Sequence, residues 1–144
     1  MKINKIEQQI VSEFETLSDW MDKYNHLIDI GKSIPLIDPK YKTNNNLISG
    51  CQSRVWLHGA YKNGKIIFSA DSDAVITKGI ISLLIRVLNH QSPDDIINTK
   101  LEFIDTIGLK EHLSPTRSNG LISMIKQMKL YALAYKAREE SAKQ

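Results

Sequence analysis

The sequence predicts a single α+β domain, residues 1–144, in which a small antiparallel sheet with a β-hairpin packs against several helices. The chain has 144 residues, a length typical of one domain, and 42% of them are hydrophobic, enough to build a core without a metal or a disulfide. Two β-prone segments follow one another around an Asn-Gly pair, with helical periodicity on both sides. Contiguous strands beside segregated helices are typical of the α+β class.

Two amphipathic helices are expected before the hairpin. The first covers about Asn4 to Thr16, where apolar residues recur at helical spacing. The second is expected to begin after Ser18 as its N-cap and to end at Gly31. Residues 34–46 contain two prolines and three consecutive asparagines, so we predict a loop there.

The hairpin itself is expected from residues 53–61 (SRVWLHGAY) and 65–70 (KIIFSA). An Asn-Gly pair between two such segments is a strong signal for a tight two-residue turn. Val55 and Leu57 share one face of the first strand and Trp56 points to the other, which indicates a sheet covered on part of both faces. We interpret Trp56 as a core residue rather than a site residue.

A very apolar helix, about Ala74 to Asn89, is expected after the hairpin. Asp71-Ser72-Asp73 precedes it and supplies side chains that suit an N-cap. Because its apolar residues lie on more than one face, we predict that it is the central buried helix. Gly79 inside it costs roughly 1 kcal/mol relative to alanine, and a close approach to a neighbouring strand would explain its presence.

Two further helices are expected towards the C-terminus. Residues 92–95 (SPDD) combine an N-cap serine, a first-turn proline and two first-turn acids, which predicts a short helix. Residues 100–104 look irregular or strand-like. The last helix is expected to begin within residues 114–119 and to run to about Glu140, and a tail at 139–144 is expected to fray.

The charge distribution argues against nucleic-acid binding. There are 19 basic and 16 acidic residues, a formal net charge of +3, which is mild. Nucleic-acid binders usually carry a concentrated basic stripe. Here the densest basic cluster is interleaved with core positions of the last helix and is interpreted as a solvated face; it comprises Lys126, Lys129, Lys136 and Arg138.

Neither a membrane segment nor a secretory signal is expected. The longest uncharged apolar stretch, Gly79 to Ile85, is far shorter than the roughly 20 residues that a membrane-spanning helix needs. The first ten residues carry charges throughout and contain no apolar block. We therefore expect a cytoplasmic protein. Separately, we expect a monomer or a weak homodimer.

The chain has one cysteine, Cys51, which excludes an internal disulfide and any cluster held by several thiolates of one chain. The four histidines are scattered, so no metal site is expected. A lone cysteine is often a small buried hydrophobe, and that structural interpretation stays open for Cys51. Three features favour reactivity: a loop position just before the first strand, small or polar neighbours, and Gly50 beside the sulfur, which permits close approach by another molecule.

Few chemical roles suit a single thiol in such a loop. A cysteine hydrolase needs a base within hydrogen-bond reach, and His58 on the adjoining strand is a candidate of unknown direction. A disulfide oxidoreductase would need a second cysteine two residues away. A persulfide carrier needs neither, because one thiolate suffices to attack a sulfur atom held by another protein. The single Cys51 fits the carrier role without demanding it.

Three sequence blocks resemble the SufE family, the sulfur acceptors that work with cysteine desulfurases in iron–sulfur cluster assembly. They occur in the family order and spacing, and the resemblance extends over nearly the whole chain. The blocks are 50–53 (GCQS) with Val55-Trp56, 71–74 (DSDA) leading into Lys78-Gly79, and 113–121 (LSPTRSNGL).

The resemblance implies a fold like SufE and the related scaffold protein IscU. It implies that Cys51 accepts sulfane sulfur from the persulfide of a SufS-like, pyridoxal-phosphate-dependent cysteine desulfurase, which it stimulates. The sulfur is then delivered to a SufBCD-type cluster scaffold. The pyridoxal phosphate belongs to the partner, so this chain is expected to bind no cofactor.

The resemblance also assigns partner-facing residues. Arg117 matches a family arginine near the cysteine, whereas from the residues alone it is a helix-start residue that pairs with a surface acid. Asp73 matches a family aspartate and is equally well explained as a helix N-cap. Gln52 is expected to shape the loop or contact a partner, and Gly50 to give access to the sulfur.

Two alternatives to the carrier remain, an iron–sulfur scaffold and a non-catalytic interaction module with a structural cysteine. A scaffold needs several cysteine ligands, and this chain has one. For a carrier we expect the loop to tuck the sulfur of Cys51 into a pocket and to swing out on docking, with Gly50 and residues 39–46 as the flexible parts. Arg117 and backbone N–H groups are the candidates to stabilise the thiolate.

Overall fold

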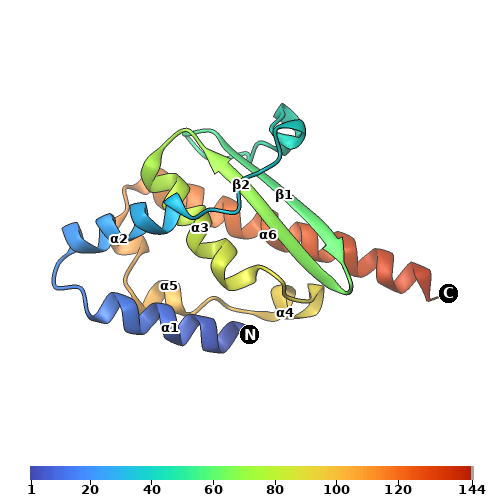
Figure 1. Cartoon of the computed structure of the whole chain (residues 1–144), viewed down its shortest axis with the longest axis horizontal. Helices are drawn as coiled ribbons and strands as arrows, with labels where there is room; N and C mark the ends of the chain where they lie inside the picture. Colours follow the sequence, from blue (N-terminus) through green and yellow to red (C-terminus); the bar gives the residue numbers. More distant parts are fainter. Residues whose placement is uncertain (144) are drawn as a thin grey trace.

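The computed structural model describes residues 1–143 and contains one hairpin surrounded by helices, which confirms the predicted α+β class (Figure 1). In chain order the elements are α1 (Ile3–Glu15), α2 (Trp20–Lys32), the 3-10 turns η1 (Pro39–Tyr41) and η2 (Asn44–Asn46), β1 (Val55–Lys62), β2 (Lys65–Ser72), α3 (Val75–Leu88), α4 (Pro93–Asn98), α5 (Phe103–Thr106), the 3-10 turn η3 (Lys110–His112) and α6 (Pro115–Ala142). No helix within residues 1–143 has the length and apolar character needed to cross a bilayer.

The predicted two-residue turn joins β1 and β2. Asn63 and Gly64 both have positive φ, 52° and 80°, as a type I′ turn requires. The strands pair from Lys62 opposite Lys65 to Val55 opposite Ser72. This register places Val55 and Leu57 on the buried face, as their alternation predicts.

The outer edge of β1 is covered by side chains and by the loop before it. The phenol hydroxyls of Tyr131 and Tyr135 on α6 donate to the carbonyls of Leu57 and Gly59, at 3.3 and 2.7 Å. The carbonyl of Val55 accepts from the N–H of Ile48 at 2.9 Å. Helix α6 is thereby fixed along β1, and Figure 1 shows it running behind the hairpin with its C-terminal end projecting past the turn.

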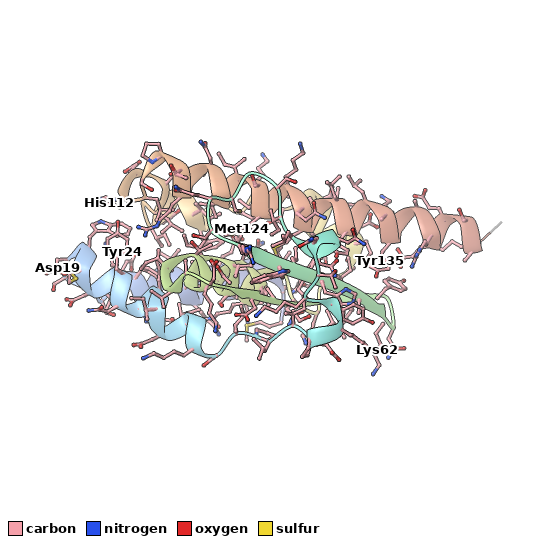
Figure 2. All side chains as sticks on the ribbon, turned by 90° about the horizontal axis from the view of Figure 1, so that it is seen from above. Asp19, Tyr24, Lys62, His112, Met124 and Tyr135 are labelled. Carbon is pink, nitrogen blue, oxygen red and sulfur yellow. The ribbon has the colours of Figure 1, made fainter. Side chains whose placement is uncertain are left out.

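The 3-10 turn η3, which precedes α6, is held by α2 at the other end of the molecule. The ring of Trp20 stacks on His112, with 3.8 Å between centroids, and the Tyr24 hydroxyl donates to the His112 carbonyl. Figure 2 shows Tyr24 and His112 together at one end of the structure, Tyr135 near the other end, and Met124 between them. The stretch of α6 around Met124 is therefore fixed from both sides.

The outer edge of β2 is covered as well, by one backbone segment that precedes the hairpin in the sequence and another that follows it. Ala70 N–H donates to the carbonyl of Pro35, and its carbonyl accepts from Ile37 N–H. Likewise, Ile66 N–H donates to the carbonyl of Gln91, and its carbonyl accepts from His90 N–H. The side-chain oxygen of Asn89 accepts from Phe68 N–H at 2.7 Å. The hairpin thus has partners on both edges, which an isolated two-stranded sheet lacks.

Helix α3 is the central buried helix, as predicted, with ten buried residues among its fourteen. The structure contradicts the expectation that Gly79 faces a strand. A Cβ built on Gly79 would lie 2.3 Å from the carbonyl oxygen of Leu27, so the close approach is between α3 and α2. Gly31 packs against the same point: a Cβ there would lie 3.0 Å from Gly79 N. Gly31 therefore serves this contact, and α2 continues past it to Lys32.

Two predictions made from local N-cap signals are wrong. The N-cap of α2 is Asp19, whose carboxylate accepts from Asp22 N–H at 2.9 Å, while Ser18 bonds to the side chain of Asp22. Asp73 is not the N-cap of α3: β2 extends to Ser72, and the cap position is Ala74, which has no side-chain acceptor.

At the C-terminus, α5 occupies part of the segment expected to be irregular. The expected start of α4 is confirmed, with the Ser92 hydroxyl accepting from Asp95 N–H at 3.2 Å. Helix α6 stays helical to Ala142, through most of the tail expected to fray, and Gln144 lies outside the described residues.

Replacing Gly79 by alanine should destabilise the protein although it improves helix propensity by roughly 1 kcal/mol. The added methyl group would meet the backbone carbonyl of Leu27, which cannot rotate away, and overpacking of this kind costs about 1–3 kcal/mol or more. Urea unfolding of Gly79→Ala measures the balance. An unchanged or higher free energy of unfolding would show that the α2–α3 contact is not tight.

Candidate functional site

Cys51 lies in a six-residue loop, residues 49–54, whose two ends are fixed. At the base, Leu47 forms a β-bridge with Trp56, and Ile48 N–H donates to Val55. At the C-terminal end, the carboxylate of Asp73 accepts from Arg54 N–H at 3.1 Å, and Asp73 N–H donates to the Arg54 carbonyl at 3.3 Å. Asp73 therefore anchors the cysteine loop to the end of β2.

Gly50 allows the loop to lie against α6. Its φ of +89° is in the left-handed region, where residues with a side chain are strained. A Cβ at this position would lie 2.4 Å from the Ser123 hydroxyl oxygen. Both the conformation and the space at position 50 require glycine, which goes beyond the access to the sulfur expected from the sequence.

The thiol of Cys51 is half-buried and points to α6. Its Sγ lies 3.7 Å from the carbonyl oxygen of Gly120, a distance at which the S–H group donates a weak hydrogen bond. Burial raises the pKa of the Cys51 thiol, because the charged thiolate loses solvation there. The free protein thus favours the thiol.

A cavity of about 320 Å³ opens beside Cys51. One wall is α3, another is the first turns of α6, and the cysteine loop closes a third side. The cavity brings together three of the predicted site residues, Cys51, Gln52 and Arg117, but neither Asp73 nor Gly50. The complete lining is Cys51, Gln52, Ser53, Thr77, Ile80, Ser114, Thr116, Arg117, Gly120 and Met124.

Comparison with known proteins decides the family. The family model described as SufE, Fe-S metabolism associated domain, matches residues 8–132. This chain belongs to the SufE family. Its membership supports a role in iron–sulfur metabolism.

Relatives with similar sequences are also SufE-like. The SufE-like protein 1, chloroplastic/mitochondrial, of Arabidopsis thaliana is 34% identical over 134 residues, which are 92% of this chain and 36% of that protein. An uncharacterized SufE-like protein of Rhizobium meliloti is 34% identical over 84% of this chain and 90% of its own length. A hypothetical protein of Thermus thermophilus, solved in solution, shares the fold with a TM-score of 0.75 at 20% identity over 90% of this chain and 94% of its own.

Arg117 occupies the first turn of α6, where the hydroxyl of the N-cap Ser114 accepts from Arg117 N–H at 3.2 Å. Its side chain is exposed, and none of the ion pairs found among residues 1–143 includes it. Pairing with a surface acid, the alternative considered from the sequence, is therefore not seen. Within the described residues, the only cation lining the cavity of this SufE-family chain is Arg117.

His58 does not lie at the site. Its ring stacks on Tyr41 with 3.7 Å between centroids, on the hairpin face opposite the core, and it does not line the Cys51 cavity. Burial, followed by the charge of Lys40, lowers the pKa of His58. A cysteine hydrolase would therefore lack its candidate base here. Trp56, on the same face of β1, is half-buried under the ammonium group of Lys42, 4.6 Å from the ring centroid.

The segment expected to be a flexible hinge is held down. Residues 39–46 form η1 and η2, and Lys42 bonds to the carboxylate of Asp71 at 2.8 Å. The stack of Tyr41 on His58 adds a second attachment. Both contacts oppose a swing of residues 39–46.

Another cavity, of about 690 Å³, lies between α1, α2 and α3, and its described lining contains no cysteine. Two of its charged groups pair with each other, because Arg86 donates two hydrogen bonds to Glu13, and His26 lies 3.0 Å from the same carboxylate. The bonds from Arg86 hold the pKa of Glu13 below its usual value. Residues 1–143 contain no cluster of three or more potential metal ligands. We therefore place the site at Cys51.

Sequence reasoning missed the residues that form the walls of the site. Ser123 and Met124 look like ordinary positions of a periodic helix, and Thr77 like one polar residue in an apolar helix. Gly120 lies within the third SufE-like block but has no chemistry of its own. Only the packing of α3 against α6 brings these four residues to Cys51 and its loop.

The reaction of free Cys51 with a small alkylating reagent should depend on pH with a midpoint above that of an ordinary cysteine. Burial disfavours the Cys51 thiolate and raises the pKa of the thiol, so a higher pH is needed to form the thiolate. Rates of iodoacetamide alkylation between about pH 6 and pH 10, a range chosen to bracket the ordinary thiol pKa, measure this. A midpoint at or below that of free cysteine would contradict the observed burial.

Gly50→Ala should displace the cysteine loop and cost about 1–3 kcal/mol of stability, since left-handed strain and contact with Ser123 both oppose the methyl group. Gly64→Ala is the matched control, because Gly64 has a similar φ of +80° and open space around it. Urea unfolding and Cys51 alkylation rates should separate the two. Faster alkylation is expected only in Gly50→Ala; identical behaviour of both variants would show that the contact with Ser123 has no effect.

Proposed function

We propose that this SufE-family chain accepts a sulfur atom as a persulfide on Cys51 from a cysteine desulfurase, stimulates that desulfurase, and delivers the sulfur for iron–sulfur cluster assembly. The observation that carries the proposal is the placement of the chain's one thiol, Cys51, in a fixed loop beside a cavity with room for a second sulfur atom. The family domain, assigned to Fe–S metabolism, supports the same pathway.

The partner of the first step is a SufS-like enzyme, whose pyridoxal phosphate generates the donor persulfide; this chain itself needs no cofactor. The recipient is a SufBCD-type scaffold. The proposed compartment is the cytoplasm, although the Arabidopsis thaliana relative is named as chloroplastic/mitochondrial.

In the transfer step, the Cys51 thiol first loses its proton. The thiolate then attacks the outer sulfur of the donor persulfide, a new sulfur–sulfur bond forms, and the donor sulfur leaves as a thiolate with the electron pair of the broken bond. No oxidant or reductant is consumed. Because burial raises the pKa of Cys51 in the free protein, docking of the partner must favour the thiolate, and Arg117 at the cavity is the residue proposed to do so.

Protection of the bound sulfur follows from the same geometry. A thiol held against Gly120 and half-buried is poorly accessible to bulky reagents, and a persulfide in the cavity would be shielded in the same way. Gly50 and Asp73 shape and hold the loop that a partner must contact, and Gln52 in that loop lines the cavity.

Mixing the protein with a cysteine desulfurase and free cysteine should add about one sulfur mass to Cys51, removable by reductant. Intact mass spectrometry measures it. Cys51→Ser should abolish the gain while folding and partner binding persist. Loss of stability in Cys51→Ser with no mass gain in the wild type would instead support an interaction module with a structural cysteine.

The same assay tests Arg117. Arg117→Ala should slow sulfur acceptance by about tenfold or more, as expected for loss of one charged interaction, while leaving the free energy of unfolding unchanged. Lys126→Ala, which removes an exposed cation on the same helix that does not line the cavity, is the control. Equal rates in both variants would remove Arg117 from the transfer step.

A further inference from the structure

Three polar side chains are buried in the described part of the chain: Thr77, Ser82 and Gln91. The hydroxyl of Ser82 donates to the Lys78 carbonyl at 2.6 Å, and the amide of Gln91 donates to the Met1 carbonyl at 2.8 Å. Thr77 differs from both. Only 7% of this residue is exposed, yet no hydrogen bond within residues 1–143 involves its hydroxyl. A largely buried hydroxyl without a protein partner is uncommon, so its surroundings need an explanation.

Thr77 lines the Cys51 cavity, which offers open space next to its side chain. Residues 1–143 contain no fully enclosed side-chain oxygen or nitrogen that lacks a hydrogen-bond partner. The unpaired hydroxyl of Thr77 is therefore not fully enclosed, and the cavity beside the sulfur is the one that Thr77 lines among the cavities described here. Its capacity to donate is available to whatever occupies that cavity.

Two helix starts border the same space. Thr77 lies in the first turn of α3, whose N-cap Ala74 supplies no side-chain acceptor, so the positive end of that helix is left without a capping side chain. The first turn of α6, with Thr116 and Arg117, forms part of another wall. Both helix starts favour negative charge between them.

The lining of this cavity suits an anionic guest. Within the described residues no carboxylate lines it, and its two ionisable groups are the Cys51 thiol and the Arg117 guanidinium. Ser53 and Thr116 add further hydroxyl groups able to donate. Ile80 and Met124 complete the lining with apolar side chains, which reduce the access of water.

We propose that the hydroxyl of Thr77 donates a hydrogen bond to the outer sulfur of the Cys51 persulfide, and so holds the transferred sulfur inside the cavity. This inference rests on the proposed function. In the unloaded protein the thiol donates to the Gly120 carbonyl, which cannot donate in return. Once a second sulfur is attached, the charged end of the side chain needs a hydrogen-bond donor. Among the buried polar side chains of residues 1–143, the hydroxyl of Thr77 is the donor without a protein partner.

Transfer of the sulfur to Cys51 consumes no further reactant. The Cys51 thiolate forms the new sulfur–sulfur bond, the donor thiolate leaves with the electron pair, and the persulfide proton goes to solvent. Thr77 takes part in no bond making or breaking. Its contribution is to hold the product anion, which lowers the rate at which an external thiol removes the sulfur.

The test loads the isolated protein with sulfane sulfur from inorganic polysulfide, so that it does not depend on a desulfurase. Excess reagent is removed, a small thiol is added, and the Cys51 persulfide is followed by intact mass. Thr77→Val should lose the sulfur about tenfold faster than wild type, the effect expected of one hydrogen bond to a charged group. Thr77→Ser, which keeps the hydroxyl, should restore the wild-type lifetime.

Ser82→Ala removes a buried hydroxyl on the same helix away from the cavity and should leave the lifetime unchanged. The alkylation rate of unloaded Cys51 should be the same in wild type and Thr77→Val, since the proposed bond exists only in the loaded protein. Thr77→Ala serves as a second variant without the hydroxyl in case Thr77→Val does not fold.

Equal persulfide lifetimes in wild type and in the variants without the hydroxyl would overturn the role of Thr77. Equally fast loss of sulfur from Thr77→Ser and Thr77→Val would also overturn the role of the Thr77 hydroxyl, because it would show an effect of packing. A wild-type chain that holds sulfur from polysulfide with the Thr77 dependence but takes none from a desulfurase would support Thr77 and contradict the proposed donor.

Discussion

A two-stranded sheet leaves many backbone groups unpaired, and the way this protein pairs them determines the rest of its structure. Both edges of the hairpin are occupied, by tyrosines of α6 on one side and by the chain around Pro35 and Gln91 on the other. These bonds satisfy groups that would otherwise recruit another strand. They also fix α6 along β1 and the end of α3 beside β2, so the two helices that form the cysteine cavity are positioned by the sheet.

The site combines protection of a sulfur atom with a cost in reactivity. The Cys51 thiol lies against the Gly120 carbonyl, and burial raises its pKa, so the form needed for attack is disfavoured while the protein is alone. The same cavity presents a guanidinium and several hydroxyls to whatever lies beyond the thiol. Burial thus disfavours the thiolate at Sγ, whereas the lining of the adjacent cavity contains a cation and hydroxyl donors that suit the anion of the proposed persulfide.

Local signals in the sequence predict those elements that local interactions decide. The Asn63-Gly64 turn and the Ser92 cap are recognisable because neighbouring residues form them. Asp73 is an example of a local signal that fails. Its residue type suits an N-cap, but pairing with β1 extends β2 to Ser72, and the Asp73 carboxylate accepts from the backbone N–H of Arg54 instead. The roles of Gly79 and Thr77 escape such reasoning, because they arise from contacts with α2 and with the Cys51 cavity, formed by segments distant in sequence.

The attachments of the loop also restrict how sulfur can move in and out. Residues 39–46 are attached by the Lys42–Asp71 pair, which opposes a swing of that segment. The cysteine loop, residues 49–54, is bonded at its two ends, by Ile48 to Val55 and by Arg54 to Asp73, and lacks such backbone bonds between them. Rotation there would separate Sγ from the Gly120 carbonyl and expose it to water in one step. In the proposed transfer, a partner that opens this short segment would also relieve the burial that disfavours the Cys51 thiolate.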